Sequence, residues 1–504
     1  MNQLKTGFIL NYVNLGIGAL IPFIYTPIML SILGQEEYGL YKLSSSVTSY
    51  LSLLSLGVGS SVTRYLIKYR EEEGRESEEK ILGLFITIFQ VIAFCSLIVG
   101  IVLALNINLL YDNSLSQQEL SKMKILIIIL TVNMVIGFLQ TPYYSAINSH
   151  ERFVFLQAFG ILLTILNPIL CLIALYMGYA SVGLAFVSLL IVILSRIVYY
   201  IYVRHIIPLK PAFCRPPKAL LKDIFLFSFW LFVGSLAYQL HGATDTILIG
   251  MIPVLSTAGV AVYSIGSILQ SMVLTMTGGL ASMLSPKVNK MVFNKTSRSE
   301  QTDVAIQYGR ILSYIVAIIV SGFISFGHPF IHFYVGDDYA QAYYVAIVIM
   351  VPSIIPLIQT VFSNILVAEN KNKFRSLVYL FIAIINIIGT WYLLKIWGIV
   401  GAALMTGLSV VIGHGVIMNW FYLKKMGLDI KRFWKNVIGV FMCPVIMSVT
   451  VILSYNYINY YTFPSLLAGI VIYSLLFVAF SWYFSMNKYE KELVLSMIRR
   501  RKNT

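Results

Sequence analysis

A short polar stretch inside an apolar segment is the part of this sequence most able to bind a proton or a cation. The stretch reads YQLHGATDTILIG over 238–250, and the apolar segment around it runs from Phe225 to about Ile252. A carboxylate in hydrocarbon is unfavourable unless it faces a wet cavity or a partner, so intramembrane acids are rare and usually functional. Four small or polar residues recur here at spacings of four, three and four, which places them on one helical face: Gly234, Tyr238, His241 and Asp245.

Asp245 and His241 lie one helical turn apart and could act together. An acid and a histidine at this spacing can exchange a proton or hold a cation, and the sequence does not distinguish H⁺ from Na⁺. The same pair could instead form a buried hydrogen bond that only fixes helix packing. Coupling to an ion and structural packing are therefore both interpretations of this pair.

A second group of candidate residues is basic and lies at span ends that are predicted to be cytoplasmic. Arg64 and Lys287 close the second and eighth spans, and Arg152 and Lys371 end the fourth and tenth. A pyrophosphate carries several negative charges, and Arg can bind it in a bidentate manner. Anchors that snorkel to the membrane surface would have the same pattern. The four residues are candidate phosphate ligands, and Arg64 is the first of them to test.

The first span has the composition of a gating helix. Pro22 and Pro27 interrupt backbone hydrogen bonding and permit bending, although a static kink filled by neighbouring helices would have the same sequence. Two charged segments are expected not to be sites. KYREEEGRESEEK, over 68–80, is typical of a solvated cytoplasmic loop or short helix. The tail over 487–504 is typical of an interfacial helix whose RRRK end meets anionic lipid.

These residues need a membrane-spanning scaffold, and the composition predicts one. Of 504 residues, 58% are hydrophobic and 11% charged, and the mean hydropathy is +0.83, which excludes a soluble globular domain. Apolar runs of roughly 20 to 26 residues recur along the chain, each long enough to cross a membrane core as a helix. We expect an all-α integral membrane protein with about fourteen spans, starting near Phe8, Tyr41, Ile81, Lys124, Phe153, Ser181, Phe225, Gly259, Ile306, Ala342, Phe374, Ile399, Phe433 and Phe463.

The basic residues predict the orientation of the chain. If the chain starts inside, alternate loops and span ends hold 32 of the 36 Lys and Arg residues, so both termini are expected to be cytoplasmic. The net charge of +15 is then a topology signal, and no nucleic-acid motif accompanies it. The cysteines have no metal or redox spacing and are expected to be reduced packing residues: Cys95, Cys171, Cys214 and Cys443.

An internal repeat organises the chain. Two passages recur in parallel orientation about 220 residues apart, so that Tyr41 aligns with Tyr263, and Asn167 with Asn386. Through the LG and IG turns, Asp245 aligns with Met29. We expect two six-helix lobes related by an axis along the membrane normal. The predicted boundaries are 1–205 for the first lobe, 206–223 for a cytoplasmic linker, 224–425 for the second lobe, 426–486 for two further spans and 487–504 for the tail.

The sequence resembles a transporter family at the following residues. SILGQEEYGLYKLSSSVTSYLSLLSLGVGSSVTRYL, over 31–66, resembles the signature between the first two helices of polysaccharide-unit flippases in the multidrug/oligosaccharidyl-lipid/polysaccharide exporter superfamily. DTILIG resembles the seventh-helix pattern of that family. The resemblance covers the whole chain and implies an inverted-V transporter whose central cavity opens alternately to either side. It implies as substrate an oligosaccharide on undecaprenyl pyrophosphate, moved to the outer leaflet of a prokaryotic plasma membrane for surface polysaccharide synthesis.

Other functions are weighed against this one. A cation-coupled exporter of small drugs would share the fold but would need more pocket acids than Asp245. A membrane glycan polymerase or glycosyltransferase would need placed carboxylates outside, yet the longest outer segment, 106–122, has only Asp112 and Glu119. We therefore expect no enzyme and no cofactor beyond a coupling ion. The expected partners are the lipid-linked oligosaccharide, the bilayer, and glycosyltransferases and a polymerase of the same pathway.

Overall fold

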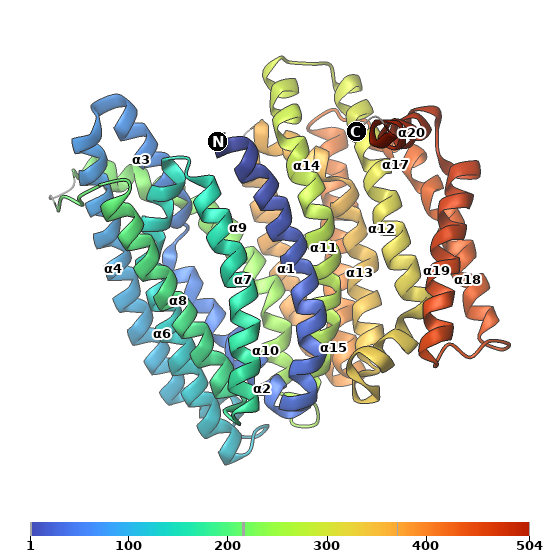
Figure 1. Cartoon of the computed structure of the whole chain (residues 1–504), viewed down its shortest axis with the longest axis horizontal. Helices are drawn as coiled ribbons and strands as arrows, with labels where there is room; N and C mark the ends of the chain where they lie inside the picture. The colour runs from blue at the N-terminus through green and yellow to red at the C-terminus, as the bar shows by residue number, and fades with distance from the viewer. Residues whose placement is uncertain (1–2, 214–216, 370, 503–504) are drawn as a thin grey trace. The chain divides into compact units, whose positions relative to one another are not determined.

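The computed structural model describes residues 3–213, 217–369 and 371–502. Within these residues the secondary structure is helical, and no strand occurs. Among the described residues, eleven helices are long and apolar enough to cross a membrane, or twelve if a pair bent by 51° is counted as one span. The chain is therefore an all-α integral membrane protein. Figure 1 shows the helices in chain order, from blue at the N-terminus to red at the C-terminus.

The expected number of fourteen spans is not confirmed by this count. The second expected span is broken by a 3-10 turn, Tyr50–Ser55, so neither α2 (Gln35–Ser49) nor α3 (Gly59–Glu73) is long enough alone. The eleventh and twelfth expected spans are merged into one stretch, Lys373–Lys424. Gly398 lies inside that stretch with φ 59°, a backbone conformation that glycine adopts without strain, so the direction of the chain changes there.

Residues 1–264 and 379–402 form a first compact unit. Within it α4, α6, α7 and α8 lie side by side (Figure 1). Its core is rich in aromatic residues, such as Phe85, Phe89 and Phe138, contributed by α4 and α6. Its helices are α1 (Gln3–Leu33), α2 (Gln35–Ser49), α3 (Gly59–Glu73), α4 (Arg75–Asn106), α5 (Asn108–Tyr111), α6 (Gln117–Ser149), α7 (Phe153–Tyr176), α8 (Ala180–His205), α9 (Lys218–Gly242) and α10 (Thr244–Gly250).

Residues 265–378 and 403–504 form a second compact unit. α11 (Ser256–Phe293) and α15 (Asn372–Val410) each contribute to both units. A cluster around Phe326, Tyr460 and Tyr473 packs α12, α18 and α19 together. The other helices of this unit are α12 (Arg298–Val335), α13 (Ala342–Ile358), α14 (Thr360–Ala368), α16 (Asn419–Lys424), α17 (Ile430–Val437), α18 (Met442–Ser454), α19 (Phe463–Phe480) and α20 (Lys488–Lys502).

Three cysteines are free, as expected: Cys95, Cys171 and Cys443. Cys214 lies outside the described residues. The tail forms α20, but the side chains of its RRRK end also lie outside what the structure describes. The division into lobes at residue 206 stays a prediction.

Candidate functional site

A break in the helix divides the polar stretch of the seventh span. α9 ends at Gly242, α10 begins at Thr244, and Ala243 between them has φ −102°. Tyr238 on α9 is 80% exposed, whereas Asp245 on α10 is 1% exposed. His241 is half-buried. The residues predicted to share one face therefore lie in different environments, with Asp245 in the interior and Tyr238 outside it.

Hydroxyl groups from two other helices bind the carboxylate of Asp245. The hydroxyl of Tyr263 on α11 donates to Oδ2 at 2.5 Å, and that of Thr390 on α15 donates to Oδ1 at 3.3 Å. Oγ1 of Thr390 also lies 3.4 Å from Oδ1 of Asn386, one turn earlier on α15. Tyr263, Asn386 and Thr390 are all buried. This set of carboxylate, hydroxyl and amide oxygens can hold a proton or a hard cation, both of which oxygen atoms bind well.

Close packing on α2 sets the position of α10. A Cβ at Gly250 would lie 2.7 Å from Cδ1 of Leu43, so the two helices approach closely there and a larger residue would displace the Leu43 side chain. The hydroxyls of Thr244 and Tyr50 lie 2.5 Å apart, in hydrogen-bond contact. These contacts at both ends of α10 hold Asp245 at its depth in the first unit.

The first predicted repeat has a similar polar pair on α7. Sγ of Cys171 donates to Oδ1 of Asn167 at 3.2 Å, one turn apart, which is the spacing of Asn386 and Thr390 on α15. Met29, which the alignment pairs with Asp245, is buried. Of the two aligned positions, one carries a titratable group and the other an apolar side chain.

Arg64 and Arg152, in the first unit, are exposed cations without an anionic partner. Neither side chain forms a hydrogen bond or ion pair with the described residues. The guanidinium carbon of Arg64, on α3, lies 4.3 Å from the centroid of the Phe227 ring on α9, a distance at which a cation–π contact forms. Such an arginine keeps its five N–H donors available for a phosphate.

Lys287 and Lys371, in the second unit, have partners within the protein. Nζ of Lys287 donates to the hydroxyl of Tyr308 at 3.2 Å. Nζ of Lys371 lies 2.7 Å from Oε2 of Glu369, whose carboxylate also pairs with Arg298. Burial alone would raise the pKa of Glu369, but the hydrogen bonds from Arg298 and Lys371 outweigh burial and lower it below its ordinary value. Lys371 thus has an anionic partner, which it shares with Arg298, whereas Arg64 has none among the described residues.

The first helix continues through both of its prolines. α1 runs from Gln3 to Leu33 with Pro22 and Pro27 inside it. Each proline lacks the N–H that would bind the carbonyl four residues earlier, at Gly18 and Phe23, so the helix is weakened at these turns. α1 packs along α7. Its bending stays a prediction.

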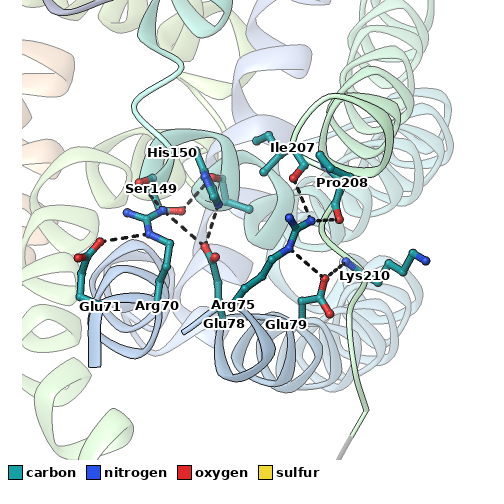
Figure 2. Close-up of polar contacts among 11 residues, drawn as sticks. Arg70, Glu71, Arg75, Glu78, Glu79, Ser149, His150, Ile207, Pro208 and Lys210 are labelled. Carbon is teal, nitrogen blue, oxygen red and sulfur yellow. Dashed lines mark hydrogen bonds and ion pairs between the residues drawn. The ribbon is translucent and has the colours of Figure 1, made fainter. Parts of the chain in front are cut away.

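The acidic segment over 68–80 is not simply a solvated loop. It forms the end of α3 and the start of α4, and Glu78 within it is only 1% exposed. Oε1 of Glu78 lies 2.9 Å from Nε2 of His150 and 3.7 Å from Nη1 of Arg70, which also donates to the carbonyl of Ser149 (Figure 2). The expectation of a solvated segment is wrong at Glu78, because the chain reversal at Gly74 turns this side of α4 towards the end of α6.

The turn between α3 and α4 also holds the start of the linker that follows α8. Arg75 donates to the carbonyls of Ile207 and Pro208, and Oε1 of Glu79 accepts from the backbone N–H of Lys210 at 2.9 Å (Figure 2). These contacts are internal to the first unit. They order the linker on α4 and leave no unpaired carboxylate at Glu78 or Glu79 for chemistry.

A seam of close contacts lies at the opposite, predicted outer, end of the first unit. A Cβ at Gly39 on α2 would lie 1.8 Å from the carbonyl oxygen of Thr257, at the start of α11. The hydroxyl of Ser256 donates to the carbonyl of Ser114 at 2.8 Å, and that of Thr257 to Oε1 of Glu119 at 3.2 Å. The seam therefore joins segments of the two predicted repeats.

Three polar residues around Asp245 were not among the predicted site residues. Tyr263 and Asn386 were visible as members of the repeat, because each aligns with a like residue in the first half. Thr390 follows Asn386 by one turn and so shares its face. The signal was present, but nothing in the sequence connects these residues to Asp245.

Two of three comparisons with known proteins found similarity. The family model for polysaccharide biosynthesis protein matches residues 4–284, which is more than half of the chain. No curated protein matches. Among solved structures, the fold is similar to the lipid II flippase MurJ in an inward closed conformation, with a TM-score of 0.73 and 18% identity over 94% of this chain and 98% of that one.

Two further solved structures share the fold at lower similarity. A multidrug resistance MATE family transporter of the MOP superfamily, in an inward-facing conformation, has a TM-score of 0.66 and 12% identity over 82% of this chain and 95% of that one. The MATE multidrug transporter DinF-BH has a TM-score of 0.60 and 16% identity over 84% and 95% of the two chains. At these identities the similarity establishes the architecture alone.

Proposed function

The chain belongs to the polysaccharide biosynthesis protein family, and from that premise we propose that it flips lipid-linked oligosaccharide repeat units across the membrane. The substrate is an oligosaccharide on undecaprenyl pyrophosphate, which moves from the cytoplasmic to the outer leaflet by alternating access. The observation that carries this proposal is the family match together with a fold that a flippase shares over nearly its full length.

The pyrophosphate would bind at Arg64. This guanidinium is exposed, has no anionic partner among the described residues, and stacks on Phe227, which orients it without neutralising it. Arg152 is a second free cation of the same unit. Lys287 and Lys371 would contribute less to phosphate binding. The ammonium group of Lys287 already donates to the hydroxyl of Tyr308, and that of Lys371 already pairs with Glu369.

The test compares Arg64→Ala and Arg64→Lys with the wild-type protein. We expect Arg64→Ala to slow the appearance of lipid-linked sugar in the outer leaflet by about tenfold, and Arg64→Lys by less, because a charge-assisted bidentate contact is lost. The control is Lys371→Gln, which removes a charge that Glu369 compensates. All rates are normalised to protein in the membrane. Equal rates for all four proteins would reduce Arg64 to a membrane anchor and remove the support for phosphate binding.

Asp245 is the residue we propose for coupling to a cation. Its carboxylate, with the oxygen atoms of Thr390 and Asn386, could bind H⁺ or Na⁺ in the interior of the first unit. The site joins α10, α11 and α15, so a change of charge there would alter contacts among three helices. His241 would act on Asp245 only through its electrostatic field, since His241 and Tyr238 are more exposed than the acid.

A cation-coupled exporter of small molecules is the second candidate, because MATE multidrug transporters share the fold. A pocket for cationic drugs would need accessible acids, and Asp245 is buried and bound by two hydroxyls. The two candidates differ in a simple experiment. Cells lacking the protein would accumulate lipid-linked sugar on the inner leaflet if it is a flippase, or cationic dye if it is a drug exporter.

The two carboxylates of the longest predicted outer segment give little support to a glycan polymerase, because both already have hydrogen-bond partners. Glu119 closes the capping box of α6 with Ser116 and accepts from Thr257, and Asp112 accepts from Gln117. We propose that partner glycosyltransferases and a polymerase of the same pathway carry out the sugar chemistry.

The proposed orientation in the plasma membrane can be tested with fused reporters. A reporter fused after Lys218 should be cytoplasmic and one fused after Asp112 external. Finding both reporters on one side would overturn this orientation.

A further inference from the structure

Arg196 is a guanidinium inside a membrane-spanning helix of the first unit. It lies nine residues before His205, the last residue of α8, which corresponds to about 13 Å along the helix axis. Its guanidinium carbon is 4.2 Å from the centroid of the Tyr143 ring on α6. Its Nη1 atom is buried and has no hydrogen-bond partner. Tyr200, one turn after Arg196 on α8, meets the Tyr143 ring edge-on at 5.6 Å between ring centroids.

Among the residues that the structure describes, Arg196 has no anionic partner, and its side chain forms no ion pair and no hydrogen bond. Arginine stays protonated in proteins, so the charge cannot be lost by titration. The face of the Tyr143 ring attracts the guanidinium, but this attraction is weaker than the free-energy cost of removing the guanidinium from water. A buried donor without an acceptor is rare in native proteins and calls for a group that completes it.

Another arginine of this chain shows what completes such a site. Arg310 on α12 also lies over a tyrosine ring, that of Tyr314, at 6.0 Å. There the guanidinium donates to both carboxylate oxygens of Glu490, at 2.6 and 2.9 Å, and to two backbone carbonyls. Arg196 has the tyrosine but lacks the oxyanion, which a bound ligand would supply.

The surroundings indicate the side from which an anion can approach. A row of exposed apolar residues runs along α8, typical of a surface that faces lipid: Phe186, Leu190, Leu194, Ile197 and Ile201. Arg196 lies on the flank of α8 between this row and the buried side, one turn before Tyr200. Tyr200, and Tyr144 next to Tyr143 on α6, are both nearly half exposed, as is typical of tyrosines at the level where lipid headgroups lie. An anion in this position is a lipid phosphate.

We propose that Arg196, stacked on Tyr143, binds the phosphate of a lipid in the leaflet at the basic end of α8. The lipid phosphate is either that of an anionic phospholipid or the diphosphate of a polyprenyl carrier. Its oxygen atoms accept from the guanidinium N–H groups, including the buried Nη1, in the bidentate geometry that arginine favours. The site does not depend on the proposed transport function, since any lipid phosphate of that leaflet would complete it.

The experiment measures lipid binding to the purified full-length protein in detergent by native mass spectrometry. Phosphatidylglycerol and undecaprenyl pyrophosphate are added in separate arms, with diacylglycerol as a probe that lacks phosphate. We expect phosphate-bearing lipid to bind the wild-type protein, Arg196→Gln to weaken that binding by about tenfold or more, and Arg196→Lys to be intermediate. Tyr143→Phe keeps the ring and should bind as the wild type does.

Arg204→Gln is the matched control, because it removes one positive charge from the exposed end of the same helix. Binding that falls in Arg196→Gln but not in Arg204→Gln supports the site, and the arm in which it falls identifies the source of the phosphate. Equal loss in both variants, or wild-type binding by Arg196→Gln in both phosphate arms, would overturn it. Because the readout is binding, a failure of transport would not affect the result.

Discussion

The hydroxyl of Tyr263 lies 2.5 Å from Oδ2 of Asp245, in the buried interior where α10 meets α11. The two residues belong to different helices and are 18 positions apart in the chain. The contact shows that a neutral donor binds the intramembrane acid. A hydroxyl group can stay hydrogen-bonded to a carboxyl group in either charge state, so this contact is compatible with a change of charge at Asp245.

Asp245→Asn tests whether that charge matters. Asparagine keeps the size and one acceptor oxygen but cannot titrate, so we expect export to fall by about tenfold or more if Asp245 couples an ion to transport. Asp245→Glu should retain part of the activity. His241→Gln should reduce export less than Asp245→Asn does, because His241 only changes the electrostatic field at the Asp245 carboxylate.

The measurement is the outer-leaflet appearance of lipid-linked sugar across about pH 6 to 8, normalised to folded protein. If the acid only fixes packing, Asp245→Asn should be tolerated, because it avoids burying a charge and can still accept a hydrogen bond. Wild-type export by this variant at every pH would therefore identify Asp245 as a packing residue.

Gly39→Ala should open or destabilise the seam between α2 and α11. The added Cβ would meet the backbone oxygen of Thr257 at 1.8 Å, and a backbone atom cannot move aside as a flexible side chain can. We expect a loss of about 1–3 kcal/mol in unfolding free energy, seen as a lower melting temperature of the purified protein.

Gly18→Ala is the matched control, since nothing lies within 4 Å of its added Cβ. In a helix this change should be neutral or stabilising by up to about 1 kcal/mol. If Gly39→Ala and Gly18→Ala had the same melting temperature, the close approach at Gly39 would make no measurable contribution to stability.

Arg310→Met should destabilise the second unit strongly. The Arg310 and Glu490 side chains are 12% and 4% exposed, so the substitution leaves a buried carboxylate without its partner. The expected cost is about 3–5 kcal/mol, whereas the double variant Arg310→Met/Glu490→Leu should recover much of it because no charge remains unpaired.

The ion pair of Arg432 with Asp303 provides the contrast, because its side chains are 46% and 50% exposed. Asp303→Asn should cost only about 0–1 kcal/mol. If Arg310→Met/Glu490→Leu were as unstable as Arg310→Met alone, the loss would come from packing around Arg310 and Glu490 and not from an unpaired charge.

The stability of the second unit should fall in acid because of Glu369. Its pKa is below the ordinary 4.5, since Arg298 and Lys371 favour the charged form over the effect of burial. A lowered folded-state pKa stabilises the fold above the unfolded pKa, and this contribution is lost as the pH falls through the folded pKa. Melting temperatures should therefore drop below about pH 4.5.

Glu369→Gln should show a smaller acid-induced drop than the wild-type protein, because it has no proton to gain at that position. Glu492→Gln is a suitable control, since Glu492 is exposed on α20 of the same unit and forms no ion pair with the described residues. An acid profile for Glu369→Gln that matches the wild type would assign the acid sensitivity to other carboxylates.

Much of the fold follows from the sequence, because the bilayer restricts what an apolar helix can do. Runs of apolar residues near the span length predict helices, and all but the broken and merged ones appear as expected. Asp245 was identifiable as an acid in an apolar segment, and the repeat marked Tyr263 and Asn386. The family resemblance rested on residues near Gly39 and Asp245.

The partners of these residues were decided only by tertiary structure. Helical periodicity tells which residues share a face, but not which neighbouring helix that face meets or how far it is rotated. Thr390 on α15 hydrogen-bonds Asp245 from 145 residues away, and Tyr238 is exposed although it was predicted to share a face with Asp245. Glu78 is buried because the turn at Gly74 brings it against His150 and Arg70, whereas Glu76, two residues earlier, stays exposed.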